Sequence, residues 1–225
     1  VPTSERERLV CRLCWARVRE LPAPRCPRCW TPVPHGREAG VRCTACADLP
    51  PTLRAVRSAF AMGEVSRKLV HALKYRRWSA LAEPMGRRMA ALPFPEDVEE
   101  EARLVVPVPT SPSRVRERGY DQAVLLAAAF AARTGRTTDP GMLARRRASG
   151  TQTALHPDER RANVAGAFTV PEGRRSGVRG EHVLLVDDVW TTGATAEACA
   201  QALLEAGARV VSVATFARVV PGLDR

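Results

Sequence analysis

Residues 183–195, with the sequence VLLVDDVWTTGAT, carry the strongest structural signal in the chain. The apolar run 183–186 predicts a buried β-strand, and the alanine-rich residues 194–206 predict a helix that ends at Gly207. Two adjacent acids and a loop of threonines and glycine separate the two elements. A buried strand followed by a loop and a helix is the repeating unit of a parallel α/β sheet.

Other segments extend this pattern along the chain. Short apolar runs alternate with alanine- and leucine-rich stretches, so we expect an α/β fold in which helices cover both faces of a mainly parallel sheet. The expected strands cover residues 104–108, 167–170, 182–186 and 209–216, with a short extended piece near 59–61. The expected helices cover residues 65–74, 79–92, 120–133 and 194–206. Two prolines and an acidic run predict a surface linker at residues 93–103.

The loop after the apolar run predicts a site for a phosphate group. Ligands of open parallel sheets bind beyond the carboxyl ends of the strands, where backbone N–H groups and the positive end of a helix attract anions. Glycine lets the backbone approach the ligand closely, and threonine hydroxyls add donors. The chain lacks both G-x-x-x-x-G-K-[ST] and G-x-G-x-x-G, which disfavours an ATP P-loop and a dinucleotide site. The predicted phosphate cradle consists of Thr191, Thr192, Gly193, Ala194 and Thr195.

The two acids before the loop, Asp187 and Asp188, do not suit direct contact with a phosphate, because like charges repel. They suit hydroxyl groups, such as the 2′ and 3′ hydroxyls of a ribose. Together with the flanking residues, they resemble the 5-phosphoribosyl-1-pyrophosphate (PRPP) motif of type I phosphoribosyltransferases. The resemblance implies that the acids bind the ribose and act in catalysis, and that residues 191–195 bind the 5-phosphate. It also implies Mg²⁺ on the pyrophosphate and ribose oxygens.

One residue departs from this motif. Trp190 stands where a smaller aliphatic residue is usual, and we expect it to change the packing under the loop while every polar position stays intact.

A second candidate contact to the substrate follows the strand expected at residues 104–108. The resemblance implies that a loop at this position contacts pyrophosphate, and arginine suits that anion because its planar fork donates paired hydrogen bonds. A solvated basic loop is the alternative interpretation. The candidate arginines are Arg114, Arg116 and Arg118.

Six of the seven cysteines form three Cys-x-x-Cys pairs within the first 46 residues. Two thiolates at this spacing share a tight turn, and two such turns complete a tetrahedral zinc site with Zn–S bonds of about 2.3 Å. The second and third pairs are separated by a usual zinc-ribbon interval, so we expect a structural Zn²⁺ on Cys26, Cys29, Cys43 and Cys46. The first pair, Cys11 and Cys14, is then vestigial or redox-active, or it belongs to a ribbon that pairs differently.

Several further segments, taken together, resemble one family. They are Lys74-Tyr75 after an expected helix, RERGYDQ at residues 116–122 and ERRANVAGAF at residues 159–168. With the cysteine pairs and the PRPP motif, they resemble the ComF/GntX family of phosphoribosyltransferase-like competence proteins over nearly the whole chain. One departure is Asp121, where the family more often has asparagine.

The helix-breaking Pro50-Pro51 after the cysteine pairs marks a boundary, and with the family resemblance it implies a division of the chain. Residues 1–50 form a zinc-ribbon module, and residues 51–225 form a type I phosphoribosyltransferase-like domain in which residues 51–92 supply a hood or helical lead-in. Residues 145–161 resemble the flexible loop that closes over PRPP in related transferases. Polar residues that suit such a lid are Thr151, Gln152, Thr153 and His156.

The same resemblance implies a function. We expect a PRPP-binding, Mg²⁺-dependent phosphoribosyltransferase-type protein that acts in natural transformation, where it handles incoming single-stranded DNA beside a helicase-like competence protein. Two alternatives stay open. One is a nucleobase salvage phosphoribosyltransferase, and the other is a non-catalytic adaptor that binds DNA or a helicase and takes PRPP as a regulatory ligand. The sequence does not identify the acceptor of a transferred phosphoribosyl group.

The composition limits the classes of partner. The chain has 225 residues, and 35 Lys+Arg against 24 Asp+Glu leave a formal charge of +11. This balance favours phosphates or nucleic acid as partners, although a coding bias toward arginine accounts for it equally well. No run of about 18 uncharged apolar residues is present, which excludes a transmembrane helix. The first 14 residues lack the apolar core of a secretory signal, so we expect a cytoplasmic protein.

Overall fold

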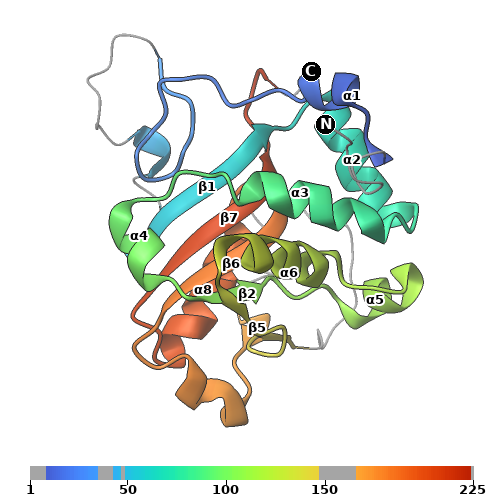
Figure 1. The fold of residues 1–225 in the computed structure, drawn as a ribbon. Helices are drawn as coiled ribbons and strands as arrows, with labels where there is room; N and C mark the ends of the chain where they lie inside the picture. The colour runs from blue at the N-terminus through green and yellow to red at the C-terminus, as the bar shows by residue number, and fades with distance from the viewer. Residues whose placement is uncertain (1–8, 35–42, 47–48, 147–165, 224–225) are drawn as a thin grey trace, which may run out of the picture.

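The computed structural model describes residues 9–34, 43–46, 49–146 and 166–223. A five-stranded sheet crosses the molecule, with helices on both sides of it (Figure 1). Neighbouring strands are all parallel and follow the order β1-β7-β6-β2-β3, which confirms the expected α/β class. The strands are β1 (Leu53–Ala61), β2 (Leu104–Pro107), β3 (Thr137–Thr138), β6 (His182–Trp190) and β7 (Val210–Arg218).

The helices connect these strands, and a small hairpin-like pair stands apart from the sheet. The α-helices are α1 (Arg12–Ala16), α2 (Glu64–Tyr75), α3 (Ala82–Met89), α4 (Glu96–Glu101), α5 (Pro112–Arg118), α6 (Gln122–Thr134) and α8 (Ala194–Glu205). Short 3-10 helices are η2 (Thr44–Cys46), η3 (Ser79–Leu81) and η4 (Glu172–Gly177). The separate antiparallel pair consists of β4 (Ala144–Arg145) and β5 (Phe168–Thr169).

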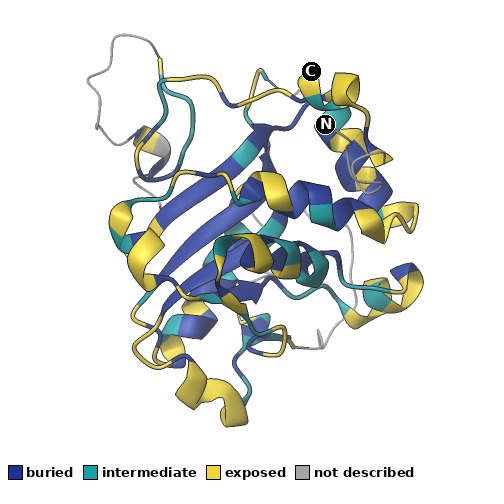
Figure 2. Cartoon of the chain, in the orientation of Figure 1, coloured by how far each residue is buried: buried dark blue, intermediate teal, exposed yellow. Residues whose placement is uncertain are grey.

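Strand β6 shows how the sheet divides the core. Leu184 and Val186 belong to a hydrophobic cluster that includes residues of α2, α3 and α6. Val183 and Leu185 belong to a second cluster, which includes residues of α8 and the cysteines of the second and third Cys-x-x-Cys pairs. The alternation arises because successive side chains of a strand point to opposite faces of the sheet. Figure 2 shows the result, with buried strands inside and exposed outer helix faces.

The acidic segment 93–103 is not the surface linker that the sequence predicted. Residues 96–101 form helix α4, whose first turn carries Glu96, Asp97 and Glu99. Acids are favourable there because the first turn of a helix is the positive end of its dipole. Val98 is fully buried and anchors the helix to the core, so the linker prediction was wrong.

Three other predicted elements differ in extent. The piece near residues 59–61 is the end of the nine-residue strand β1, which pairs in parallel with β7. The helix predicted at 79–92 begins as η3 and ends at Met89. The strand predicted at 167–170 shrinks to β5 and pairs with β4 instead of joining the parallel sheet.

The carboxyl ends of β2 and β6 lie side by side. Pro107 is in register with Val186, and Val108 N donates a 2.9 Å hydrogen bond to the Val186 carbonyl. This pairing brings the segment that follows β2 next to the acids at the end of β6.

Candidate functional site

The loop between β6 and α8 makes a turn that requires glycine. Gly193 has a φ of +89°, in the left-handed region, and a Cβ there would lie 2.4 Å from Cζ2 of Trp190. Trp190 is only 7% exposed and packs beneath the loop. Trp190, which departs from the PRPP motif, therefore fits beneath the loop because the glycine of that motif, Gly193, has no side chain to clash with its ring.

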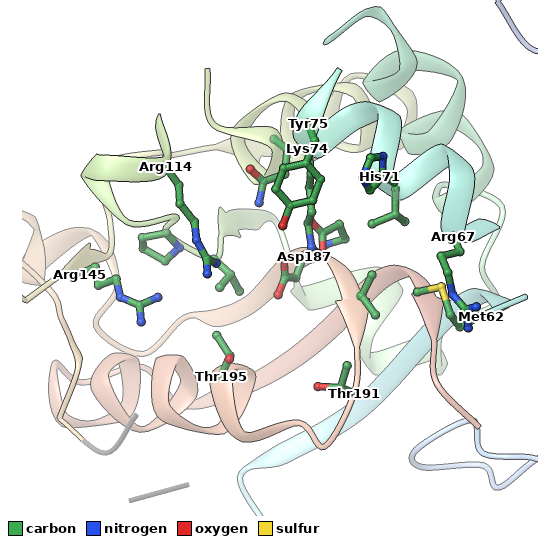
Figure 3. A pocket seen from close by; sticks show the side chains of 16 residues that line it. Met62, Arg67, His71, Lys74, Tyr75, Arg114, Arg145, Asp187, Thr191 and Thr195 are labelled. Atoms are coloured by element: carbon green, nitrogen blue, oxygen red, sulfur yellow. Dashed lines mark hydrogen bonds and ion pairs between the residues drawn. The ribbon is translucent and has the colours of Figure 1, made fainter. Parts of the chain in front are cut away.

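The threonines of the predicted cradle divide between the cavity and the loop itself. Thr191 and Thr195 line the cavity above the sheet, and Figure 3 shows both on the wall opposite α2. Thr192 is exposed, and its hydroxyl accepts a 3.4 Å hydrogen bond from the N–H of Ala194, the first residue of α8. The positive end of this twelve-residue helix thus lies directly behind the loop.

Asp187 and Asp188 line the same cavity. Asp188 N donates a 2.7 Å hydrogen bond to Oδ1 of Asp187, and Lys74 Nζ lies 2.7 Å from Oδ1 of Asp188. The second oxygen of Asp188, Oδ2, is buried and has no hydrogen-bond partner among the described residues. The structure therefore brings the two acids together and leaves one buried acceptor, Oδ2 of Asp188, unmatched.

The surroundings of Asp187 make its negative charge costly. Burial disfavours the carboxylate, and the charge of Asp188 repels it, so the pKa of Asp187 rises to about 8. Lys74 acts in the opposite direction, but its effect is smaller. An acid pair with this property suits a ligand that brings hydroxyl donors or a cation, because either one offsets the charge.

Helix α2 supplies the wall of the cavity that faces the acids. The cavity has a volume of about 450 Å³. Figure 3 shows Lys74 reaching down from α2 toward Asp187, with His71 and Tyr75 beside it. Arg67 lines the same wall. In the sequence, Lys74-Tyr75 stood out only as part of the family resemblance. The contact between Lys74 and Asp188 was not predicted, because the two residues are far apart in the chain and no local pattern relates them.

The three candidate pyrophosphate arginines have different environments, and they lie on helix α5 instead of a loop. Arg114 extends from α5 into the cavity, which Arg145 of β4 also lines (Figure 3). Arg116 is exposed and does not line the cavity. Arg118 is buried, donates a 2.5 Å hydrogen bond to Oε1 of Gln122 and stacks over the Tyr75 ring at 5.1 Å. Only Arg114 of the three is positioned to contact a ligand in the cavity.

Asp121, the second departure from the family pattern, has a local structural role. Its carboxylate accepts hydrogen bonds from the N–H and hydroxyl of Thr110, at 3.1 and 3.0 Å, and from Ala123 N at 2.9 Å. It therefore caps α6 and fixes the segment after β2 against that helix. The predicted lid residues Thr151, Gln152, Thr153 and His156 lie outside the described residues.

Four of the cysteines form a compact buried cluster. The Sγ atoms of Cys26 and Cys46 are 3.4 Å apart, as are those of Cys29 and Cys43, and Cys43 and Cys46 are 3.7 Å apart. A tetrahedral ion with metal–sulfur bonds of about 2.3 Å requires sulfur–sulfur distances of about 3.8 Å. The crowding also raises the pKa of Cys43, to about 11, through burial and the neighbouring Cys29. The four side chains thus fit a metal ion, as the spacing predicted.

A buried arginine connects this cluster to the loop after β6. Arg218, at the end of β7, donates hydrogen bonds to the carbonyl of Cys29 and to Oγ1 of Thr31. Its guanidinium also lies 5.4 Å from the centre of the Trp190 ring. Because Trp190 packs against Gly193, a continuous series of contacts through Arg218 and Trp190 connects the cysteine cluster to the threonine loop.

Cys11 and Cys14 lie apart from the four-cysteine cluster. Both are exposed, and Cys11 caps helix α1 by accepting a 3.4 Å hydrogen bond from Cys14 N. Among the described residues, the group suited to hold a metal contains only the other four cysteines.

Comparisons with known proteins agree with this geometry. Residues 122–222 match the phosphoribosyl transferase domain family. The chain is 32% identical over 221 residues to the DNA utilization protein YhgH of Salmonella typhi, covering 94% of this chain and 91% of that protein. It is 26% identical over 210 residues to the competence protein ComFC of Bacillus subtilis (strain 168), covering 92% of this chain and 82% of that protein.

Solved structures of lower overall similarity include a glutamine PRPP amidotransferase from B. subtilis. The match has a TM-score of 0.39 and 26% identity, and it covers 59% of this chain and 25% of that one. None of the helices in the described part of the chain is both long and apolar enough to cross a bilayer.

Proposed function

Because this chain belongs to the ComF/GntX family of proteins with a phosphoribosyltransferase domain, we propose that it binds PRPP with Mg²⁺ at the end of β6. We further propose that it is a phosphoribosyltransferase-type protein of the cytoplasm that handles single-stranded DNA in natural transformation. The observation that supports this most strongly is an acid pair with one unmatched, buried oxygen that lines, together with Thr191 and Thr195, a cavity large enough for a sugar phosphate.

The loop and the acids divide the ligand between them in this proposal. Thr191 and Thr195, with the backbone N–H groups from Thr192 to Ala194, bind the 5-phosphate at the positive end of α8. The ribose hydroxyls donate to Asp187 and, after a side-chain shift that exposes the buried Oδ2, to Asp188, whose other oxygen is paired with Lys74.

The pyrophosphate group then faces the basic side of the cavity. Arg114 and Arg145 extend into that region, and their forks suit the charge that develops on departing pyrophosphate. Mg²⁺ would neutralise the same oxygens when it is bound. Arg118 acts as a positioning residue, since it holds Gln122 and Tyr75 at the cavity wall and does not line the cavity itself.

The cysteine cluster holds Zn²⁺ in this proposal. Its four sulfurs are buried and form a closed set, which is the arrangement of a structural zinc site. Residues 1–50 then form the metal-bearing module and residues 51–225 the PRPP-binding domain, whose hood is the α2 wall.

The role in DNA handling rests on the two relatives, whose names refer to DNA utilization and competence. The net charge of +11 is consistent with a nucleic-acid partner. A helicase-like partner stays a prediction from the family resemblance.

The test is calorimetric titration of PRPP with and without Mg²⁺. We expect binding that requires Mg²⁺ and that weakens at least tenfold in Asp188→Asn, which keeps the side-chain shape and removes the charge. Asp97→Asn is the matched control, because it makes the same change at an exposed surface pair with Arg54. Equal PRPP affinity in Asp188→Asn and the parent protein would contradict the proposal.

A second measurement separates transfer from simple binding. Pyrophosphate release from PRPP is followed with and without single-stranded DNA. Release that depends on DNA supports the transferase, whereas PRPP binding without release in either condition supports the adaptor alternative.

A further inference from the structure

The end of helix α2 exposes two aromatic side chains beside the cavity. Tyr75 is 56% exposed and Trp78 is 50% exposed, and they are the only large aromatic side chains that are exposed in the described part of the chain. Arg76 and Arg77 separate them and are exposed as well. Arg77 also has a φ of +55°, in a region that residues other than glycine seldom occupy.

Helix α5 adds positive charge to the same surface. Arg118 of α5 stacks over Tyr75, and the Tyr120 hydroxyl donates to the Leu73 carbonyl, so the ends of α2 and α5 are held together. Figure 1 shows both ends on one side of the molecule. We call this surface the α2–α5 ledge and define it by Tyr75, Arg76, Arg77, Trp78 and Arg114, since Arg114 and Arg118 share the α5 face that meets α2.

The two aromatic rings of the ledge have different surroundings. Tyr75 is held between the His71 ring, with centroids 4.9 Å apart, and the guanidinium of Arg118. No ring or guanidinium stacks on Trp78 within the described residues, so this indole face is open. An open indole face flanked by arginines suits a nucleotide, which provides both a flat apolar base and an adjacent phosphate.

We propose that the α2–α5 ledge binds single-stranded DNA, with a base stacked on Trp78 and phosphates on Arg76 and Arg77. This rests on the proposed function and locates its DNA contact. Tyr75 and Arg114 belong both to the ledge and to the cavity lining, so the bound strand leads toward the ribose site. Bases of a duplex are stacked inside it, and the ledge therefore selects single strands.

The composition of the ledge differs from what a general excess of arginine would produce. Coding bias distributes arginines without regard to aromatic residues, whereas here two exposed aromatics and two exposed arginines occupy the consecutive positions 75–78, beginning at Tyr75, which lines the cavity. Glu117 is the acid within α5, and it leaves the ledge strongly positive.

The test measures binding of a fluorescein-labelled 20-mer of thymidine by anisotropy. We expect Trp78→Ala to weaken binding about tenfold or more, the loss of one stacked base, and Trp78→Phe to restore most of it. The double variant Arg76→Ser/Arg77→Ser should lower the dependence of log affinity on log salt by about 1.4. Its charge-matched control is Arg103→Ser/Arg133→Ser, which removes two exposed arginines beside the amino-terminal ends of β2 and β3.

Two further readouts complete the test. Tryptophan fluorescence should fall when DNA binds and should not fall in Trp78→Phe, since the other described tryptophans are more buried. PRPP binding should be unchanged in Trp78→Ala, because Trp78 does not line the cavity, and this also shows that the variant is folded.

The outcomes distinguish the ledge from the function on which it rests. DNA binding by the parent protein that Trp78→Ala leaves unchanged, or equal affinity for a duplex of the same length, overturns the ledge and leaves the DNA role standing. Absence of DNA binding by the parent protein, with PRPP binding intact, overturns both the ledge and the DNA role. In that case the aromatic surface fits a protein partner instead.

Discussion

The cysteine cluster and the cavity at the end of β6 both bury polar groups, but they differ in how completely those groups are matched. The four sulfurs of the cluster contact one another at distances close to those of a tetrahedral metal site. At the cavity, one buried oxygen of Asp188 has no partner among the described residues, and Thr191 and Thr195 line the open space. Four cysteines that complete the coordination of a metal stabilise a fold, whereas polar groups without a partner suit a ligand that binds reversibly.

The two regions also differ in how they are held. Arginines surround the cluster and donate to backbone carbonyls near it: Arg28 to Cys46, Leu49 and Leu53, and Arg57 to Pro27 and Pro93. Such bonds fix the irregular backbone of a small module. The cavity instead depends on one turn, at Gly193, and on one ion pair that crosses it, between Lys74 and Asp188.

The largest expected effect follows from replacing a ligand of the cluster. We expect Cys43→Ser to abolish stoichiometric metal binding and to destabilise the protein by at least about 5 kcal/mol, which lowers Tm by about 10–20 °C. Metal content by elemental analysis and thermal unfolding measure the two effects. Cys11→Ser is the control, because that cysteine is exposed and outside the cluster. Equal metal loss in Cys11→Ser would show that the first pair shares the site.

The second prediction concerns the turn that supports the cavity. Gly193→Ala combines left-handed strain with a clash against Trp190, and we expect it to cost about 2–4 kcal/mol of unfolding free energy. Gly119→Ala has the same kind of φ, +85°, but no atom within 4 Å, so it should cost only about 1–2 kcal/mol. Chemical denaturation measures both. Equal costs would mean that Trp190 does not limit the loop.

The sequence predicted the two regions to different depths. Residues 183–206 were predictable because a four-residue apolar run and an alanine-rich helix give strong local periodicity, and the cysteine spacing predicted which four cysteines cluster. Local patterns did not predict that Lys74 contacts Asp188, since that contact depends on how α2 packs over the sheet. They also did not separate Arg114 from Arg118, because burial of one arginine on a short helix is decided by its tertiary neighbours.

The error at residues 93–103 has a physical lesson of its own. Prolines and consecutive acids suggested a linker, yet the acids fall in the first turn of α4 and a single buried valine, Val98, anchors it. An acidic run directly after a proline is also a helix start signal. The pattern was present in the sequence, and its interpretation was wrong.

The third prediction tests whether the two regions are coupled through Arg218. Replacing it in Arg218→Met keeps apolar contact with Trp190 but removes the donors to Cys29 and Thr31. We expect a loss of about 2–3 kcal/mol in unfolding free energy and PRPP binding several-fold weaker, with metal content unchanged because all four sulfurs remain. Arg54→Met removes an exposed ion pair and should cost about 1 kcal/mol or less.

The decisive measurement for coupling is hydrogen exchange of residues 191–193 with and without the metal. Faster exchange in the metal-free protein, and in Arg218→Met, supports a packed connection from cluster to loop. Exchange that is the same in all three samples would show that the two regions are independent.

The smallest expected effect concerns the stability of the acid pair. Burial and the charge of Asp188 raise the pKa of Asp187 to about 8, from an unfolded value of about 4. Because folding raises this pKa, the native state holds the proton more tightly than the unfolded chain does. The free energy of unfolding of the parent protein therefore falls as pH rises from about 4 to about 8. Asp187→Asn does not titrate. It should therefore exceed the parent in stability by a margin that widens from pH 5 to pH 8 and is constant above.

We expect that margin to reach about 1–2 kcal/mol at pH 8, because partial solvent access to Asp187 reduces the effect of its raised pKa. Denaturation at several pH values measures it, and Asp97→Asn serves as the exposed control. The same Asp187→Asn protein should bind PRPP poorly, so that it is more stable and less functional than the parent. A difference in stability that does not change with pH would show that ionisation of Asp187 does not destabilise the protein. A difference that widens with pH, together with lost PRPP binding, would show that the cavity keeps a destabilising carboxylate because its ligand requires it.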